Sequence, residues 1–309
     1  MRKRSVDIII PAYNEEDCIN ELSERLVSLF VIEKSYKFRV IIIENGSIDS
    51  TWSKIIEICK SDKRFTALKL SRNFRMDGGL TAGLDQATAD ACVLMTADLQ
   101  DPPELISEFL RLWEKGWENI YGIVTKREGT GLIRTMNSKL FYWVAEKLTD
   151  GRIPKNASDF RLVDKKVYES VRSMKERNRF MRGLFAWVGF ASIGVPMHRP
   201  PRFGGESKAH TFKIIDLALK GIFAHSYKPL KFISIIGIFM SISSFMSLIP
   251  LLFIWVKDGV PFAGFGSIIS TLLLLIGILF LLIGVLSEYV GLVYEEVKSR
   301  PNFIISDKI

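Results

Sequence analysis

The chain has 309 residues, 48% of them hydrophobic and 25% charged, which excludes a disordered or low-complexity protein. Its 42 lysines and arginines outnumber its 34 acidic residues, and the charge of +8 suits nucleic acid, anionic lipid or a phosphorylated substrate. Residues 232–256 and 259–287 contain no charged side chain. Both segments exceed the roughly 20 residues that span a membrane, so a purely soluble protein is not expected and phosphates or lipid headgroups are favoured over nucleic acid.

The first 125 residues alternate between short apolar runs and helical patterns. Strands are predicted over residues 6–10, 39–43, 66–70 and 91–95, and helices over 15–31, 49–59, 79–88 and 103–115. Near-continuous apolar strands separated by helices predict a mostly parallel sheet covered on both faces. Ligands of such sheets bind beyond the carboxyl ends of the strands.

Polar residues follow all four predicted strands. The four strand ends lie in residues 11–16, 44–49, 71–75 and 96–103, and they carry acids, amides and basic groups. Ordinary caps and turns explain Asn45-Gly46 or Asp49 taken alone. The recurrence at four successive strand ends indicates a functional edge of the sheet.

Other features concern the compartment and the membrane. Cys18, Cys59 and Cys92 have no disulfide-like or metal-like spacing, which favours a reducing compartment, and no signal peptide is predicted. Residues 131–148 predict an amphipathic helix that lies either on the protein core or in the bilayer interface, and residues 209–230 predict a second one. The uncharged segments predict a hairpin with spans at about 232–256 and 262–287, and the lysines and arginines flanking it place the soluble part and both termini in the cytoplasm.

Several motifs carry a resemblance to a known family. They are Pro11-Ala12-Tyr13-Asn14-Glu15-Glu16, Leu70-Ser71-Arg72-Asn73-Phe74, Ala97-Asp98-Leu99-Gln100-Asp101-Pro102-Pro103-Glu104, Asp159-Phe160-Arg161-Leu162 and Arg202-Phe203-Gly204-Gly205-Glu206-Ser207-Lys208. With them the chain resembles, over nearly its whole length, the family 2 glycosyltransferases that move a sugar from a nucleotide onto a polyprenyl phosphate. That group includes dolichyl-phosphate mannose synthases and bactoprenol glucosyltransferases.

The resemblance implies a fold and a division of the chain. The fold would be α/β, with a GT-A type, Rossmann-like, mostly parallel sheet domain followed by a two-helix transmembrane hairpin. Residues 1–208 would form the catalytic domain, 209–230 the juxtamembrane helix, 231–288 the hairpin and 289–309 a cytoplasmic tail. The implied activity is inverting transfer of a hexose, from UDP-glucose or a similar donor, to undecaprenyl phosphate for cell-envelope or O-antigen modification. Relatives associate as homo-oligomers, which implies the same here.

The resemblance also implies roles for individual residues. Catalysis would involve Asp98, Gln100 and Asp101, with Asp98 and Gln100 holding a divalent metal, Mg²⁺ or Mn²⁺, that neutralises the leaving diphosphate. The sugar nucleotide would contact Pro11, Ala12, Tyr13, Asn14, Glu15, Glu44, Asn45, Ser47, Arg72, Thr96 and Ala97. The lipid phosphate and the diphosphate would be bound by Arg127, Arg134, Arg161, Arg202, Ser207 and Lys208. The acceptor phosphate is already anionic, so no catalytic histidine is required, and His198, His210 and His225 are interpreted as packing or interface residues.

The chain departs from the family pattern twice. Relatives read Asp-Asp-Gly-Ser where this chain has Glu44-Asn45-Gly46-Ser47, and Asp-x-Asp where this chain has Thr96-Ala97-Asp98. Three outcomes stay open: weaker metal binding, a different donor nucleotide, or a catalytically weak or non-catalytic membrane-anchored nucleotide-binding homologue. A processive polysaccharide synthase is disfavoured, because neither of the two glutamines, Gln86 and Gln100, begins a Gln-x-x-Arg-Trp motif.

Overall fold

The computed structural model describes residues 3–127, 156–177, 179–200 and 264–309, with scattered positions between 233 and 257. The chain forms two units, one of Met1–Ala218 with Ser299–Ile309 and one of Leu219–Lys298. The predicted helices at 131–148 and 209–230 and most of the first predicted span lie outside the described residues. So do Arg134, Arg202, Ser207 and Lys208.

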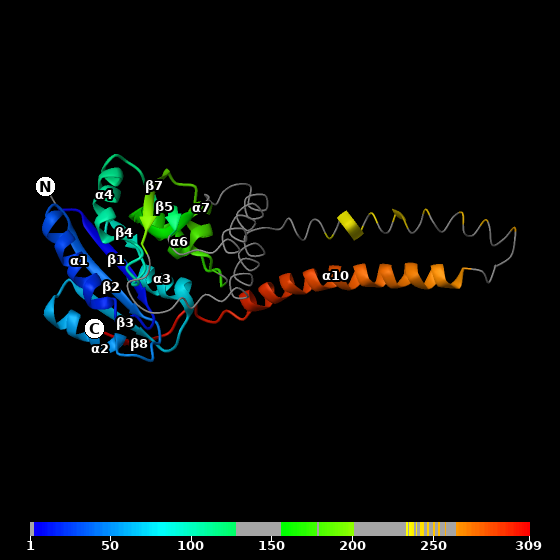
Figure 1. Cartoon of the computed structure of the whole chain (residues 1–309), viewed down its shortest axis with the longest axis horizontal. Helices are drawn as coiled ribbons and strands as arrows, with labels where there is room; N and C mark the ends of the chain where they lie inside the picture. The colour runs from blue at the N-terminus through cyan, green and yellow to red at the C-terminus, as the bar shows by residue number, and fades with distance from the viewer. Residues whose placement is uncertain are drawn as a thin grey trace. The chain divides into compact units, whose positions relative to one another are not determined.

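The first unit contains an eight-stranded sheet with the order β7-β5-β6-β4-β1-β2-β3-β8 (Figure 1). The strands are β1 (Ser5–Ala12), β2 (Lys37–Glu44), β3 (Phe65–Leu70), β4 (Ala91–Leu94), β5 (Asn119–Arg127), β6 (Ala157–Asp164), β7 (Ser192–Arg199) and β8 (Ile305–Lys308). The four strands predicted from the sequence are β1 to β4. They pair in parallel in the order β4-β1-β2-β3, so the prediction of a mostly parallel sheet is confirmed.

Helices cover both faces of the sheet. They are α1 (Ile19–Ile32), α2 (Thr51–Ser61), α3 (Arg75–Gln86), η1 (Pro103–Leu105), α4 (Ile106–Glu114), α6 (Lys165–Ser173) and α7 (Met181–Trp187). One core cluster contains the apolar faces of α1, α2 and α4, and the other contains those of α3, α6 and α7. Successive strand residues alternate between the clusters: Ile8 and Ile10 face the first and Ile9 faces the second. This two-sided burial explains the near-continuous apolar strands, since each fully buried isoleucine contributes about 1.5–3 kcal/mol.

The C-terminal segment returns to this sheet. Strand β8 pairs antiparallel with β3, and the amide and carbonyl of Ile309 each bind Ala67 at 2.9 Å (Figure 1). Phe303 packs against the second core cluster. The sequence predicts no strand here, because a four-residue segment with exposed side chains has no apolar pattern.

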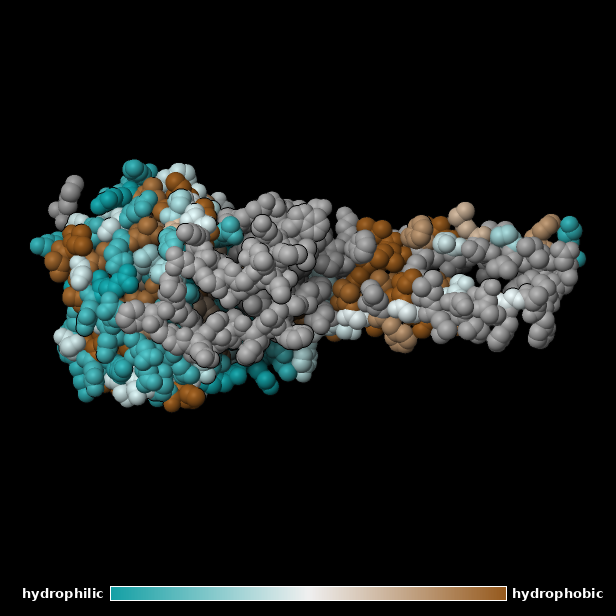
Figure 2. Space-filling model, viewed as in Figure 1, coloured by the Kyte–Doolittle hydropathy of each residue, from teal (hydrophilic) through white to brown (hydrophobic). Residues whose placement is uncertain are grey.

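The second unit contributes α10 (Phe265–Val297), a helix that carries the second uncharged segment. Among the helices that the structure describes, Leu275–Val297 is the one stretch long and apolar enough to cross a membrane by length and composition. Hydrophobic side chains lie exposed along this helix, among them Leu272, Leu279, Phe280, Ile283 and Val290 (Figure 2). The predicted two-helix hairpin therefore has one of its two helices in the described part of the chain.

Candidate active site

The carboxyl ends of β1 to β4 meet at one edge of the sheet. One residue with a left-handed backbone follows each strand: Asn14 (φ 52°), Gly46 (φ 74°), Arg75 (φ 64°), which is the first residue of α3, and Leu99 (φ 58°). Residues other than glycine rarely adopt this conformation, and such strain concentrates at functional sites. Three of the strand ends predicted as functional, those with Asn14, Arg75 and Leu99, are thus unusual in their backbone as well as their composition.

The loops after β1 and β2 bind each other through side chains. The Asn14 N–H donates to Ser47 Oγ and the Ile48 N–H donates to Asn14 Oδ1, both at 3.0 Å. The Glu15 N–H donates to Thr51 Oγ1 at 2.9 Å. These reciprocal bonds hold the first two loops as one surface, on which Tyr13, Asn14, Glu15 and Ser47 are partly exposed.

Asn45 joins this surface to the loop after β3. Its Nδ2 donates to the Arg75 carbonyl at 2.8 Å and its Oδ1 accepts from the Phe74 N–H at 2.9 Å. Both ends of the amide therefore bind backbone, which is a reason for asparagine here besides the predicted nucleotide contact. The guanidinium of Arg72, exposed on the same loop, lies 4.5 Å from the centroid of the Phe74 ring.

Glu44 ends β2 and is fully buried, with 0% of its surface exposed. One carboxylate oxygen accepts the Ser47 N–H. The other oxygen, Oε2, is buried and has no hydrogen-bond partner among the described residues. A buried carboxylate oxygen without a donor is costly, so a ligand that brings a hydroxyl or an N–H would be favoured here.

The loop after β4 gathers two buried carboxylates around Thr96. Thr96 Oγ1 lies 2.7 Å from Asp98 Oδ1 and 2.8 Å from Asp101 Oδ2, and the Thr96 N–H donates to Asp101 Oδ2 at 3.0 Å. Asp98 is 4% exposed and Asp101 is 0% exposed. Burial raises the pKa of Asp101, and Arg199 and the Thr96 bonds oppose that shift. Leu99, between the aspartate and Gln100, packs into the first core cluster and so anchors the strained turn.

Strand β7 supplies a cation that sequence analysis did not identify. Arg199 Nη2 lies 3.5 Å from Asp101 Oδ1, and the side-chain amide of Gln100 donates to the Pro200 carbonyl at 3.2 Å. Arg199 and Arg127 are register partners at the ends of β7 and β5, so the predicted Arg127 lies on the same part of the sheet. The sequence signal for Arg199 was its position, since it is a basic residue that ends an apolar segment just before the basic motif at 202–208.

A second cluster of charged side chains lies on β6 and α7. Arg182 binds both carboxylate oxygens of Asp159, at 3.2 and 2.6 Å. Burial acts to raise the pKa of Asp159, but the arginines, Arg182 above all, hold it below its ordinary value. The predicted phosphate ligand Arg161 is buried, and burial lowers its pKa to about 10. Its guanidinium lies 4.8 Å from the centroid of the Phe185 ring and donates to the Ser158 carbonyl at 3.0 Å.

Pro11 and Ala12 end β1 as buried residues, and the backbone of Ala12 accepts the Asn45 N–H at 2.9 Å. Ala97 is buried in the loop after β4, beside Asp98. Among the candidate ligands with described side chains, the structure therefore brings together those of the four strand ends. Arg161 lies on β6 opposite Leu94, the last residue of β4, and so belongs to the same end of the sheet.

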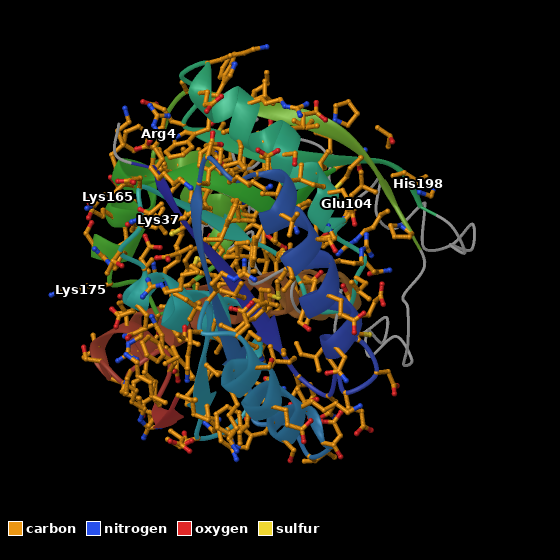
Figure 3. The ribbon with its side chains drawn as sticks, turned by 90° about the vertical axis from the view of Figure 1, so that its left-hand side faces the viewer. Arg4, Lys37, Glu104, Lys165, Lys175 and His198 are labelled. Atoms are coloured by element: carbon orange, nitrogen blue, oxygen red, sulfur yellow. The ribbon has the colours of Figure 1, made fainter. Side chains whose placement is uncertain are left out.

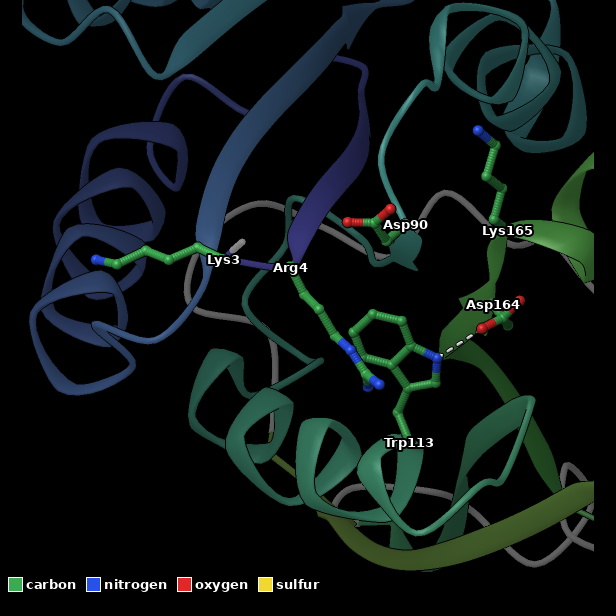
Figure 4. Close-up of a pocket in the computed structure, with 6 residues that line it drawn as sticks. All are labelled: Lys3, Arg4, Asp90, Trp113, Asp164 and Lys165. Carbon is green, nitrogen blue, oxygen red and sulfur yellow. Dashed lines mark hydrogen bonds between the residues drawn. The ribbon is translucent and has the colours of Figure 1, made fainter. Parts of the chain in front are cut away.

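The opposite edge of the sheet holds a cavity of about 440 Å³ lined by Lys3, Arg4, Asp90, Trp113, Asp164 and Lys165 (Figure 4). Its acids already have protein partners, since Trp113 Nε1 donates to Asp164 and Ser5 donates to Asp90, each at 2.8 Å. Figure 3 shows Arg4, Lys37 and Lys165 on one side of the unit and Glu104 and His198 on the other. The cavity is therefore separate from the edge that carries the strand-end loops.

Comparison with known proteins decides the family. The model of "Glycosyl transferase family 2" matches residues 7–172. The chain belongs to this family. Full-length relatives are similar as well: an uncharacterized glycosyltransferase of Synechocystis is 38% identical over 305 residues, covering 98% of this chain and 95% of its own. A bactoprenol glucosyl transferase of Shigella phage SfX is 34% identical over 303 residues, covering 98% and 99%.

Solved structures confirm the fold of this family 2 glycosyltransferase. The glucosyl-3-phosphoglycerate synthase of Mycobacterium tuberculosis, crystallised with Mn²⁺, UDP and its product, matches with a TM-score of 0.51 at 17% identity, covering 71% of this chain and 78% of its own. The mannosyl-3-phosphoglycerate synthase of Rubrobacter xylanophilus matches with a TM-score of 0.50 at 13% identity, covering 72% and 73%. The expected GT-A type sheet is thus confirmed. The family match and the full-length relatives confirm the expected enzyme class, a glycosyltransferase.

Proposed function

We propose that the enzyme transfers a hexose from a sugar nucleotide, UDP-glucose or a similar donor, to undecaprenyl phosphate, for cell-envelope or O-antigen glycan modification. The observation that carries the proposal is the loop after β4, where Asp98 and Asp101 meet at Thr96. In the same loop, Asp101 and Gln100 contact Arg199 and Pro200 at the end of β7. The bactoprenol glucosyl transferase named above, similar along nearly its whole length, supports the lipid acceptor and the glucose.

The chemistry is a single displacement at the anomeric carbon. A phosphate oxygen of the lipid attacks C1, the bond from C1 to the diphosphate oxygen breaks, and the nucleoside diphosphate leaves with the electron pair, so the configuration inverts. The attacking phosphate is anionic at neutral pH and needs orientation more than a general base. Of the candidate lipid-phosphate ligands, Arg127 ends β5 beside this edge, and Arg134, Arg202, Ser207 and Lys208 are proposed from the resemblance.

The strand-end loops orient the donor. The joined loops after β1 and β2 provide Tyr13, Asn14, Glu15 and Ser47 for the nucleoside. Glu44 Oε2 provides an acceptor for a ribose hydroxyl or a base N–H, which would satisfy its lone pairs. Arg72, exposed on the loop after β3, supplies positive charge for the diphosphate.

A divalent metal fits the loop after β4. A carboxylate and an amide oxygen are ligands that Mg²⁺ and Mn²⁺ accept, and Asp98 and Gln100 lie in one turn, with the Gln100 N–H donating to Asp98 Oδ1 at 3.3 Å. The described residues hold no cluster of three or more histidine, cysteine or acidic ligands. Two protein ligands plus phosphate oxygens is an arrangement typical of Mg²⁺. When bound, the metal would stabilise the negative charge on the leaving diphosphate.

The apolar helix α10 supports a membrane anchor. We propose that it pairs with the segment at about 232–256 as a two-helix hairpin, with the catalytic unit and both termini on the cytoplasmic side and the chain assembled as a homo-oligomer. The flanking lysines and arginines support this orientation. The arrangement would bring the catalytic unit to the lipid phosphate.

The test uses the full chain in membranes with undecaprenyl phosphate, Mg²⁺ or Mn²⁺, and a panel of labelled sugar nucleotides. We expect one hexose nucleotide to give a labelled, lipid-extractable product, and a chelator to abolish it. Nucleotide binding without transfer from any donor would overturn the proposal.

Asp98→Ala tests the metal assignment in the same membranes. We expect it to abolish transfer while the protein still inserts and folds. Asp62→Ala is the matched control, because Asp62 lies before β3 at the opposite edge and its ion pair with Arg64 is worth at most about 1 kcal/mol. Near-normal transfer by Asp98→Ala would refute the assignment.

A further inference from the structure

The loop after β4 contains a continuous line of polar contacts from Arg199 to Asp98. Arg199 pairs with Asp101 Oδ1 at 3.5 Å, Asp101 Oδ2 contacts the backbone and hydroxyl of Thr96, and the hydroxyl reaches Asp98 Oδ1 at 2.7 Å. Thr96 is the middle member of this line and the position at which the chain departs from the Asp-x-Asp pattern.

The Thr96 hydroxyl can donate its proton to only one of the two carboxylates beside it. The Thr96 hydroxyl has one proton and faces two carboxylates, at 2.7 Å to Asp98 and 2.8 Å to Asp101. Asp101 Oδ2 also receives the Thr96 N–H at 3.0 Å, and its Oδ1 faces Arg199. Arg199 attracts Asp101 Oδ1 by charge without a hydrogen bond to it, and the Thr96 N–H already binds Asp101 Oδ2. Because the hydroxyl also lies closer to Asp98 than to Asp101, we assign its proton to Asp98.

The same atom of Asp98, Oδ1, also receives the Gln100 N–H at 3.3 Å. With two donors on one oxygen, the carboxylate cannot rotate without breaking both bonds. A carboxylate at position 96 would carry no such donor proton when ionised. Threonine thus provides a directed hydrogen bond where aspartate would provide charge.

We infer that Thr96 is a positioning residue, which orients the Asp98 carboxylate for the divalent metal and ties it to the ion pair of buried Asp101 with Arg199. The inference rests on the proposed function, since Asp98 is there a metal ligand. Thr96 itself need not touch the metal. Its effect on metal affinity is transmitted through Asp98, because a hydrogen bond to a charged group is worth about tenfold or more in an equilibrium constant.

The test measures Mn²⁺ affinity of the purified full chain by electron paramagnetic resonance, with and without UDP. Thr96→Val keeps the side-chain shape and removes the hydroxyl, and we expect Mn²⁺ to bind at least about tenfold more weakly in the presence of UDP. Thr96→Ser keeps the hydroxyl, and we expect affinity within about threefold of wild type. The thermal midpoint without metal is measured alongside, since a merely structural role would lower it in Thr96→Val and leave the Mn²⁺ affinity unchanged.

A double-variant cycle tests the line of contacts itself. If Asp101 acts through Thr96, Asp101→Asn with Thr96→Val should bind Mn²⁺ no more than about twofold more weakly than the weaker single variant. Independent, multiplicative losses would overturn the link. Wild-type affinity in Thr96→Val, or no Mn²⁺ binding by the wild type with UDP, would overturn the positioning role. Mn²⁺–UDP binding that responds to Thr96→Val, with no lipid product from any donor, would instead overturn the proposed function alone.

Discussion

Gly46 lies where the loops after β2 and β3 touch, and Gly46→Ala is the sharpest test of that contact. The residue has φ of 74°, and an added Cβ would lie 2.6 Å from both the Arg72 carbonyl carbon and the Asn73 nitrogen. These are backbone atoms, which have no rotamer to move into. The substitution must therefore separate the two loops that Asn45 holds together.

Two effects are expected to lower the folding stability of Gly46→Ala. A left-handed backbone costs alanine about 1–2 kcal/mol, and overpacking adds about 1–3 kcal/mol. Gly116→Ala is the matched control, because Gly116 has φ of 96° but nothing within 4 Å of its added Cβ. The control should lose about 1–2 kcal/mol, from the backbone alone.

Thermal unfolding of the full chain measures the difference. For a domain of this size, about 1 kcal/mol moves the midpoint by roughly 2–4 °C, so Gly46→Ala should fall several degrees below Gly116→Ala. We also expect Gly46→Ala to bind UDP more weakly, since the Phe74 and Arg75 bonds to Asn45 stretch. Equal midpoints for the two variants would refute the steric reasoning.

Two further predictions concern stability. Burial, with a smaller contribution from Asp159, raises the pKa of Asp77 to about 6, against about 3.9 for an unfolded aspartate. The folded state then binds more protons between these values, so stability from this group rises as pH falls from about 6 to about 4. Asp77→Asn should flatten the dependence of the thermal midpoint on pH, and equal slopes would contradict this. Deleting residues 304–309 removes β8 and its bonds to Ala67 and Ser71, leaving β3 as an edge strand. We expect a lower midpoint and more light scattering than in the exposed-site control Asp307→Ala, and unchanged scattering would argue against the edge-strand role.

Local patterns predicted the elements closely where the pattern was strong. All four predicted strands are present, and the four predicted helices differ from α1, α2, α3 and η1–α4 mainly at their ends. Helix α3 begins four residues earlier than predicted, at Arg75, whose positive φ and whose bond to Asn45 are tertiary features. Strand β8 was missed for the same reason, because its stability comes from β3 and not from its own residues.

The candidate site shows the same division. Asp98, Gln100 and Asp101 were recognisable from their motif, whereas the pairing of Asp101 with Arg199 and of Asp159 with Arg182 was not. The paired residues lie 23 positions apart for Asp159 and Arg182 and 98 positions apart for Asp101 and Arg199. Charge pairs at such separations produce no periodic pattern in the sequence. Asn45 was predicted as a nucleotide contact, and the structure adds a role in holding two loops together.

By itself the sequence determined the parallel sheet, through its buried apolar runs, and the functional edge, through the polar residues that follow each strand. It also determined the family, through its motifs, and the two uncharged segments, through their length. Only the tertiary structure decided which groups at that edge face each other. The Thr96 hydroxyl, a departure from the motif in the sequence, became the link between two buried carboxylates once the turn at Leu99 brought Asp98 and Asp101 around it. Hydrogen bonds of this kind depend on distance and direction, and folding alone supplies both.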